Sequence, residues 1–255
     1  MTLQQERDGG VLTLTLDRPE RYNAIDAELA GSLVAALADA PRAGARAVVI
    51  RGAGKGFSAG ADLSSRADPG WPVFQRLAAV GHEVTRAVLT CPLPVVASVH
   101  GACAGLSLAM VLGADVSLAT ADARLMMPFL DRGLVPDGAI TRLLPRIVGM
   151  TKAKQLLFLG REVSAVDAER LGLVTKVVEP DRLTEETAAV AAELAALPTL
   201  AVGLTKSLLA RAFEGDLDGH LLLERSAQAV HSTTADRAEG GAAFRERRPP
   251  RFEGR

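Results

Sequence analysis

Apolar and polar positions alternate with two different periods in the first forty residues of the chain. Residues 11–16 (VLTLTL) alternate with period two, which is typical of a strand with one buried face. The turn signal Asp8-Gly9-Gly10 precedes this strand, so we expect a hairpin with a strand over residues 3–7. Residues 24–40 carry apolar side chains at helical spacing, with Asp26 near the start. The chain therefore begins with a predicted β-hairpin followed by a helix.

Strand and helix patterns continue to alternate up to residue 119. Strands are predicted over residues 45–51, 94–99 and 115–119, and helices over 73–89 and 105–114. Residues 64–72 are polar and contain Pro69-Gly70, which is typical of a mobile loop. This alternation predicts an α/β fold with a largely parallel sheet.

The pattern becomes almost entirely helical after Asp137. Helices are predicted over residues 139–148, 152–159, 165–171, 183–197, 200–213, 217–231 and 236–247. Residues 174–178 (VTKVV) are the one strand expected in this half. A core that mixes strands and helices is thus followed by a segment made of helices alone.

Composition narrows the class of protein. The chain has 255 residues, is 48% hydrophobic and carries a formal net charge of −1, which suits a globular core and disfavours nucleic acid or an anionic membrane as partner. Its two cysteines, Cys91 and Cys103, form no disulfide framework and fit a reducing compartment. The N-terminal residues lack an apolar signal core, and no apolar run is long enough to span a membrane. We therefore expect a cytoplasmic protein.

Two corners rich in glycine and alanine each follow a buried strand. The first corner is Ser58-Ala59-Gly60-Ala61-Asp62, and the second corner is His100-Gly101-Ala102-Cys103-Ala104-Gly105-Leu106. Small residues let another molecule approach the backbone closely, and a helix start leaves backbone N–H groups free. Two such corners that face each other can form an oxyanion hole. Tight structural turns are the alternative interpretation.

The two corners resemble the signature segments of the enoyl-CoA hydratase/isomerase (crotonase) superfamily. Further segments extend the resemblance over essentially the whole chain in the order of the family: residues 18–24, 133–138, 168–174 and 244–249. The resemblance implies a crotonase-like spiral core of ββα units over residues 1–195. It also implies a C-terminal helical trimerisation segment over residues 196–255, and hence a homotrimer or hexamer.

The resemblance assigns the two oxyanion donors to the backbone N–H groups of Ala61 and Leu106. Leu106 departs from the family pattern, in which this position is usually glycine. The hydratases of the family activate water with two glutamates, and ungapped matching puts Ala109 and Phe129 at those positions. Neither side chain can transfer a proton. Water activation of that kind is therefore not expected.

Asp137 stands where family members that move a double bond, and some that act on aromatic thioesters, carry an acid. One carboxylate suffices for isomerisation, because it can remove a proton from carbon 2 of a 3-enoyl thioester and return it at carbon 4 while the oxyanion hole holds the dienolate. The alternative is that Asp137 caps the helix expected from residue 139.

The resemblance also implies a path for the adenine and pantetheine groups of coenzyme A. The residues whose backbone would line this path are Arg21, Tyr22, Ala24, Ala59 and Ala61. Arg21 and Lys55 are candidate partners for the phosphates, because cations offset the charge of the ligand. Phe252, in the basic C-terminal stretch, is a candidate contact for the nucleotide, sometimes that of a neighbouring subunit. Solvated surface charges and a solvated tail are the alternatives.

Other polar residues near the motifs receive structural interpretations. We expect Asp62 to fix the first corner through local N–H groups, and His100 to be a hydrogen-bonding residue of the second. Asp131 is interpreted as a solvated loop charge, and Cys103 as a buried apolar residue. The histidines show no metal-ligand spacing, so no metal is expected, and coenzyme A is part of the substrate rather than a separate cofactor.

Three functions follow from these residues. The leading hypothesis is an acyl-CoA enzyme that shifts the double bond of an enoyl-CoA thioester through Asp137. The second is hydration of a 2-enoyl-CoA. The third is a protein that binds acyl-CoA without turnover, which Leu106, Ala109 and Phe129 favour.

Overall fold

The computed structural model describes residues 2–64 and 71–255, with the side chains of all of these except residues 71–78. The chain opens with an antiparallel hairpin of β1 (Leu3–Asp8) and β2 (Val11–Leu16), in which Leu3 pairs with Leu16. The predicted hairpin is confirmed. Leu12, Leu14 and Leu16 of β2 point into the core, as their period of two predicts.

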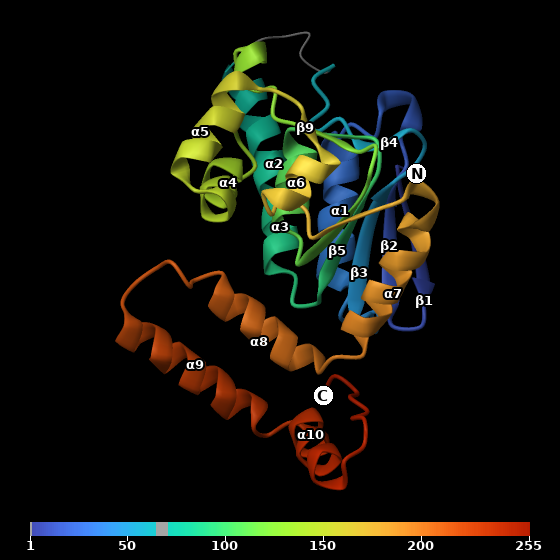
Figure 1. The fold of residues 1–255 in the computed structure, drawn as a ribbon, viewed down its shortest axis with the longest axis vertical. Helices are drawn as coiled ribbons and strands as arrows, with labels where there is room; N and C mark the ends of the chain where they lie inside the picture. Colours follow the sequence, from blue (N-terminus) through green and yellow to red (C-terminus); the bar gives the residue numbers. More distant parts are fainter. Residues whose placement is uncertain (1, 65–70) are drawn as a thin grey trace.

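The remaining strands belong to two sheets (Figure 1). They are β3 (Ala47–Gly52), β4 (Gly56–Ser58), β5 (Val95–Val99), β6 (Ala102–Ala104), β7 (Val116–Thr120), β8 (Arg124–Met126), β9 (Val163–Ser164) and β10 (Lys176–Val178). The six-stranded sheet has the order β1-β2-β3-β5-β7-β10 and is parallel from β2 onward, and the four-stranded sheet has the order β4-β6-β8-β9. The predicted α/β fold with a largely parallel sheet is confirmed.

Ten helices accompany the strands in the described part of the chain. They are α1 (Ala27–Asp39), α2 (Trp71–Thr90), α3 (Leu106–Gly113), α4 (Ile140–Val148), α5 (Met150–Leu159), α6 (Ala165–Arg170), α7 (Leu183–Ala195), α8 (Thr199–Leu209), α9 (Leu217–His231) and α10 (Ala235–Glu246). The loop expected over residues 64–72 falls mainly on residues 65–70, which lie outside the described residues, and Trp71 already belongs to α2.

A repeated unit generates the spiral. The units β3-β4-α2 and β5-β6-α3 each add one strand to the large sheet, one strand to the small sheet, and a helix. Successive units are neighbours in both sheets, because β3 pairs with β5 and β4 pairs with β6. The ends of β4 and β6, where the chain leaves the small sheet, therefore lie side by side. This repetition brings the two corners together.

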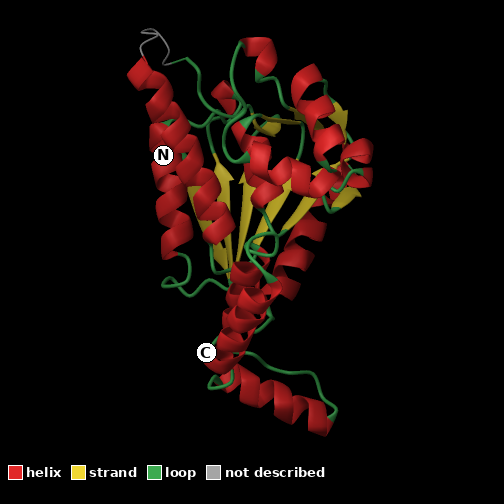
Figure 2. Cartoon of the chain, turned by 90° about the vertical axis from the view of Figure 1, so that its left-hand side faces the viewer, coloured by secondary structure: helices red, strands yellow, loops and turns green. Residues whose placement is uncertain are grey.

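Helices cover both faces of the large sheet. The main core lies under α1, α2 and α3, and a second cluster under α7 contains Val49, Val96 and Leu118. All five residues of β5 are buried, as a central parallel strand requires. Figure 2 shows the sheet between these layers.

The first helix begins later than the sequence pattern predicts. Tyr22 and Asn23 adopt left-handed backbone conformations, with φ of 51° and 54°, and Ile25, inside the predicted helix, pairs with Ala61 instead of joining a helical turn. Asp26 then caps α1 by accepting a hydrogen bond from the N–H of Leu29 at 2.9 Å. Residues 24–26 therefore form an extended link rather than the first helical turn.

The last three helices extend from one end of the sheet core (Figures 1 and 2). Lys206 of α8 fastens them to the core, because its Nζ donates to Asp115 Oδ2 at 2.5 Å and to the carbonyl of Leu93 at 2.8 Å. Arg142 of α4 pairs with Glu214, and the Arg146 guanidinium lies 5.7 Å from the ring centre of Phe213. The division into residues 1–195 and 196–255 stays a prediction.

No single helix among the described residues is long and apolar enough to cross a membrane. The pair Pro180–Ala195 and Thr199–Leu209, which is bent by 99°, reaches that length and hydropathy only when its two parts are counted together.

Candidate active site

The first corner is held by a set of buried hydrogen bonds. Asn23 is fully buried, and its Nδ2 lies 2.7, 3.0 and 3.2 Å from the carbonyl oxygens of Ala53, Gly56 and Phe57. The Ser58 hydroxyl donates to the carbonyl of Asn23 at 2.8 Å and accepts from the N–H of Gly60 at 3.1 Å. The left-handed Asn23 thus joins the turn before β4 to the corner after it.

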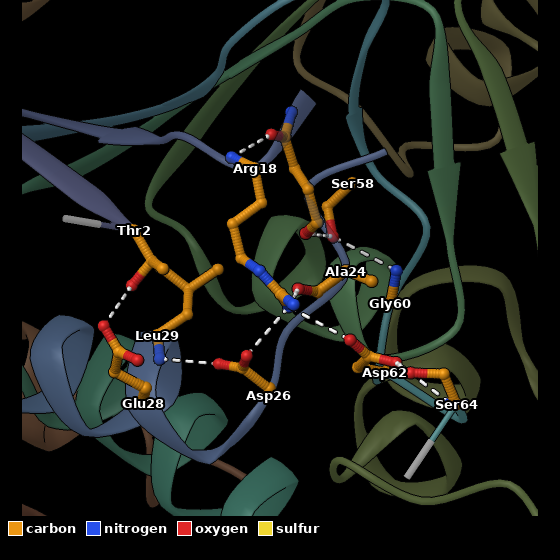
Figure 3. Close-up of polar contacts among 11 residues, drawn as sticks. Thr2, Arg18, Ala24, Asp26, Glu28, Leu29, Ser58, Gly60, Asp62 and Ser64 are labelled. Carbon is orange, nitrogen blue, oxygen red and sulfur yellow. Dashed lines mark hydrogen bonds and ion pairs between the residues drawn. The ribbon is translucent and has the colours of Figure 1, made fainter. Parts of the chain in front are cut away.

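An ion-pair cluster closes the same corner (Figure 3). The Arg18 guanidinium lies between Asp26 and Asp62, with N–O distances of 3.0 and 3.1 Å. Asp62 also accepts hydrogen bonds from the N–H and hydroxyl of Ser64, at 3.0 and 2.6 Å. The Ser64 hydroxyl, followed by its N–H and by Arg18, lowers the pKa of Asp62 below 3.8, although burial opposes this shift. Asp62 fixes the corner, as predicted.

The second corner is held mainly by packing. Gly105, with φ of 55°, lies against the ring of Phe129 and leads into α3 at Leu106. The Leu106 side chain is buried and contacts Gly81 of α2 and Gly138. The ring Nε2 of His100 lies 2.9 Å from the carbonyl of Gly54, which confirms its structural interpretation. Cys103 is fully buried, and burial raises the pKa of its thiol to about 12.

The two corners touch at Gly60. A methyl group at this residue would lie 2.5 Å from the carbonyl oxygen of Ala104 and 3.2 Å from the amide nitrogen of Leu106. Only glycine permits this approach, and its φ of 89° is a second reason for glycine. The peptide of Ala61 is consequently adjacent to the first residue of α3.

Both predicted donors have available N–H groups. Ile25 donates to the carbonyl of Gly60 at 2.7 Å and accepts from Asp62 at 2.8 Å, so the N–H of Ala61, between these bonds, points away from Ile25. Leu106 is the first residue of α3, where the helix supplies no acceptor. Neither N–H has a hydrogen-bond partner among the residues that the structure describes. Two adjacent free donors can hold a carbonyl oxygen that becomes negatively charged.

The segment that carries Asp137 lies beside the second corner. A methyl group at Gly138 would lie 3.0 Å from Leu106 Cδ1, 3.2 Å from Ala109 Cβ and 3.4 Å from Thr85 Oγ1. The helix α4 begins at Ile140 with Ala139 at its N-cap, so Asp137 does not occupy the N-cap position. Asp137 is half-buried and has interaction partners of its own. It is the acidic residue next to the glycine that packs on Leu106.

The positions that the hydratase glutamates would take are apolar and tightly packed. Ala109 is completely buried in α3 and contacts Gly138, and the Phe129 ring contacts Gly105. Asp131 is exposed, and its carboxylate lies over Gly160 at the end of α5 rather than toward Leu106. Asp131 is solvent-exposed, as predicted, but it lies in a short 3-10 helix (Leu130–Arg132) rather than in a loop.

Several residues of the predicted coenzyme A path lie together at the first corner. The N–H of Ala59 donates to the carbonyl of Tyr22 at 2.9 Å, and Ala24 precedes the Ile25–Ala61 bridge. Arg21 and Lys55 are exposed, and Gly54, next to Lys55, lies against Pro19, which belongs to the same 3-10 helix (Pro19–Arg21) as Arg21. Phe252 lies in the C-terminal segment against Gly240 of α10, so this protomer does not bring it to the corners. Its role stays a prediction.

Sequence reasoning missed Ser107. This residue follows Leu106, is completely buried, and contacts backbone groups of both corners. A serine at the start of a helix is ordinarily interpreted as a local cap, and only the tertiary structure shows what its hydroxyl reaches. Among the described residues, no cluster of three or more His, Cys, Asp or Glu side chains could hold a metal ion.

Comparison with known proteins gives one family for this chain. The sequence model of the family described as enoyl-CoA hydratase/isomerase matches residues 6–255. A 1,2-epoxyphenylacetyl-CoA isomerase of Escherichia coli K12 is 37% identical over 251 residues, covering 96% of each chain. A short-chain-enoyl-CoA hydratase of Clostridium acetobutylicum is 31% identical and covers 95% of this chain and 94% of its own.

Solved structures agree with this result. The crystal structure of an enoyl-CoA hydratase from Mycobacterium smegmatis superposes with a TM-score of 0.92 at 35% identity and covers 99% of both chains. The relatives include enzymes named as isomerases and enzymes named as hydratases, so their names leave the reaction open. The full-length match, together with the meeting of the two corners, shows that the chain belongs to the enoyl-CoA hydratase/isomerase family.

Proposed function

We propose that this protein is an enoyl-CoA isomerase that converts a 3-enoyl-CoA into a 2-enoyl-CoA with Asp137 as its acid–base group. The observation that supports the proposal is the close approach of Gly138 to Leu106 and Ala109, because it brings the backbone segment that carries Asp137 next to the start of α3 and to apolar side chains. A site with one acid and an apolar surround favours proton transfer over the addition of water.

The proposed reaction needs three groups of this chain. The thioester oxygen accepts hydrogen bonds from the N–H groups of Ala61 and Leu106, which stabilise the enolate as negative charge develops there. The Asp137 carboxylate removes a proton from carbon 2 of the substrate, giving a dienolate. The resulting carboxylic acid returns the proton at carbon 4, and the double bond moves to carbon 2. The atoms balance without water or any additional cofactor.

The test replaces Asp137 by asparagine and follows a 3-enoyl-CoA by chromatography and mass. We expect the wild type to produce the 2-enoyl isomer at unchanged mass, and Asp137→Asn to lose about 100-fold or more in kcat, because general acid–base catalysis contributes that much. Asp131→Asn is the matched control: it removes an acid six residues away that lies over Gly160, and should leave the rate unchanged. Full isomerisation by Asp137→Asn would refute the assigned base.

The two other functions are outcomes of the same assay. A product heavier by one water from a 2-enoyl-CoA would identify a hydratase, the name that several relatives carry. Tight binding of both thioesters with no product would identify a binding protein. In either case the isomerase proposal would fail.

We propose that Arg21 and Lys55 contact the phosphates of coenzyme A. Both cations are exposed near the first corner, Arg21 at the end of the 3-10 helix Pro19–Arg21 and Lys55 in the turn before β4, where the ligand's negative charge would favour them. Arg21→Gln and Lys55→Gln should each raise KM and its dependence on salt while kcat stays constant. We propose that Phe252 contacts the nucleotide in the site of a neighbouring subunit, so that Phe252→Ala raises KM only in the oligomer.

We further propose a cytoplasmic homotrimer or hexamer. The helices α8 and α9 are described in full and contain no buried residue, and Leu209, Phe213 and Leu217 are 66%, 75% and 71% exposed. Such an apolar surface is typical of an interface between subunits. Light scattering after size-exclusion chromatography measures the mass, and a monomer would refute the oligomer. The two free cysteines support a reducing compartment.

A further inference from the structure

The Ser107 hydroxyl lies between the ends of the two strands that carry the corners. The N–H of Ala104, in the second corner, donates to Ser107 Oγ at 2.9 Å. The same Oγ lies 2.8 Å from the carbonyl oxygen of Ser58, in the first corner. Ser107 therefore links the ends of the paired strands β4 and β6, where the chain turns toward the two free N–H groups.

The hydroxyl has one hydrogen, which limits its bonds. With the Ala104 N–H occupying one lone pair, the hydrogen can go to Ser58 or to the carbonyl of Ala104, which also lies 2.8 Å away. Of these two possible bonds of the hydroxyl hydrogen, only the one to Ser58 links the second corner to the first. Cys103 Sγ, at 3.6 Å, offers only a weak partner. Because Ser107 is completely buried, its truncation leaves the Ala104 N–H and the Ser58 carbonyl without this partner.

The residues that the Ser107 hydroxyl contacts lie close in sequence to both predicted donors. Ser58 is three residues before Ala61, and the Ser58 side chain already fixes the N–H of Gly60. Ala104 is two residues before Leu106, and Ser107 follows it. We propose that Ser107 is a positioning residue that sets the separation and direction of the Ala61 and Leu106 N–H groups. The proposal rests on the proposed function in one respect: the ligand of these N–H groups is the carbonyl oxygen of an acyl-CoA thioester.

The test measures the polarisation of that carbonyl. Hexanoyl-CoA labelled with ¹³C at carbon 1 has no double bond to move, and isotope-edited infrared difference spectra report the C=O stretch of the bound thioester. Ser107→Ala removes the hydroxyl, and Ser107→Cys keeps a group of similar size with weak hydrogen bonding. Ser98→Ala is the matched control, because Ser98 is also buried and its hydroxyl bonds to Thr187 Oγ1 at 3.0 Å, under α7.

We expect a downshifted C=O stretch in the wild type and in Ser98→Ala. Both Ser107 variants should lose most of the downshift, and kcat with a 3-enoyl-CoA should fall by about 10- to 100-fold, less than for complete removal of a donor. KM should change little. Urea unfolding of all three variants separates a loss of stability from a loss of alignment.

The outcomes distinguish this inference from the isomerase proposal. A wild type that shifts the carbonyl without isomerising its substrate, while Ser107→Ala abolishes the shift, would refute the reaction and support the role of Ser107. Variants of Ser107 that keep the full downshift and rate would overturn the inference whatever the reaction is. A wild type that leaves the carbonyl unshifted would overturn it as well.

Discussion

The two corners carry equivalent N–H groups but are held by different forces. The first corner depends on directional polar contacts: the Asn23 amide spans three carbonyls, and Arg18 joins two carboxylates. The second corner depends on close packing of the Leu106 side chain against Gly81 and Gly138, and of Phe129 against Gly105. The first corner should therefore lose stability when a hydrogen-bonding or charged partner is removed. The second corner should lose stability when the size of a packed side chain changes. The two corners contact each other at Gly60 and through the hydrogen bond of the Ser107 hydroxyl to Ser58.

The largest effect is expected where the corners touch. Gly60→Ala puts a methyl group 2.5 Å from the Ala104 oxygen and in a strained backbone conformation, so the corners must separate. We expect kcat/KM to fall by about 100-fold or more, as for loss of an oxyanion donor. Steady-state kinetics measures this loss. Gly31→Ala is the control, because nothing lies near its Cβ position inside α1, and it should stabilise the fold by about 1 kcal/mol.

The next effect tests the packed corner. Leu106→Ala keeps the backbone N–H but leaves a cavity between α2 and Gly138, and the free energy of unfolding should fall by about 3 kcal/mol. Urea unfolding at low and high salt measures it. The loss should not depend on salt, since no charge is involved. A loss that shrinks at high salt would show that the second corner is not held by packing.

A smaller effect is expected in the polar corner. Asn23→Ala leaves three carbonyls without their shared donor, and the free energy of unfolding should fall by about 2 kcal/mol. Asn23→Gly relieves the strain of the left-handed backbone but restores no hydrogen bond. If Asn23→Gly is as stable as the wild type, backbone strain rather than hydrogen bonding explains the loss, and the contrast between the corners is wrong.

The smallest effect is expected at low pH, where the first corner should lose its hydrogen-exchange protection before the second corner does. Hydrogen bonds from Ser64, together with Arg18, lower the pKa of folded Asp62 below 3.8, so its stabilisation is present above that pH and is lost as the pH falls below it. Hydrogen-exchange protection should therefore drop at residues 60–63 before it drops at residues 104–109. Asp62→Asn should abolish this difference. Simultaneous loss of protection in both corners of the wild type would contradict it.

Sequence patterns predicted the long elements well because their periods are strong. The alternation of β2 and the helical spacing of α9 predict each element to within a residue. The three-residue strands β4, β6 and β8 were not predicted, since so short a strand has no measurable period. The start of α1 was misplaced because Ile25 pairs with Ala61, which is distant in the sequence, and local preference does not reveal that contact.

The candidate site was likewise predicted only in part from the sequence. The glycines and the resemblance placed Ala61, Leu106 and Asp137 as candidates, and the structure brings their segments into contact through Gly60 and Gly138. Their chemical roles stay predictions. The sequence could not reveal that Leu106 fits because Gly81 and Gly138 leave room for it, or that Ser107 reaches across to Ser58. Both depend on residues that are distant in the chain.

The packing of Leu106 between two glycines has an evolutionary consequence. Gly81, Leu106 and Gly138 share one fixed volume, since a methyl group at residue 81 or 138 would lie 3.3 or 3.0 Å from Leu106 Cδ1. Enlarging position 81 or 138 displaces the end of the Leu106 side chain, so either change is easiest after position 106 has become smaller. The three positions are thereby coupled, although they are distant from one another in the sequence.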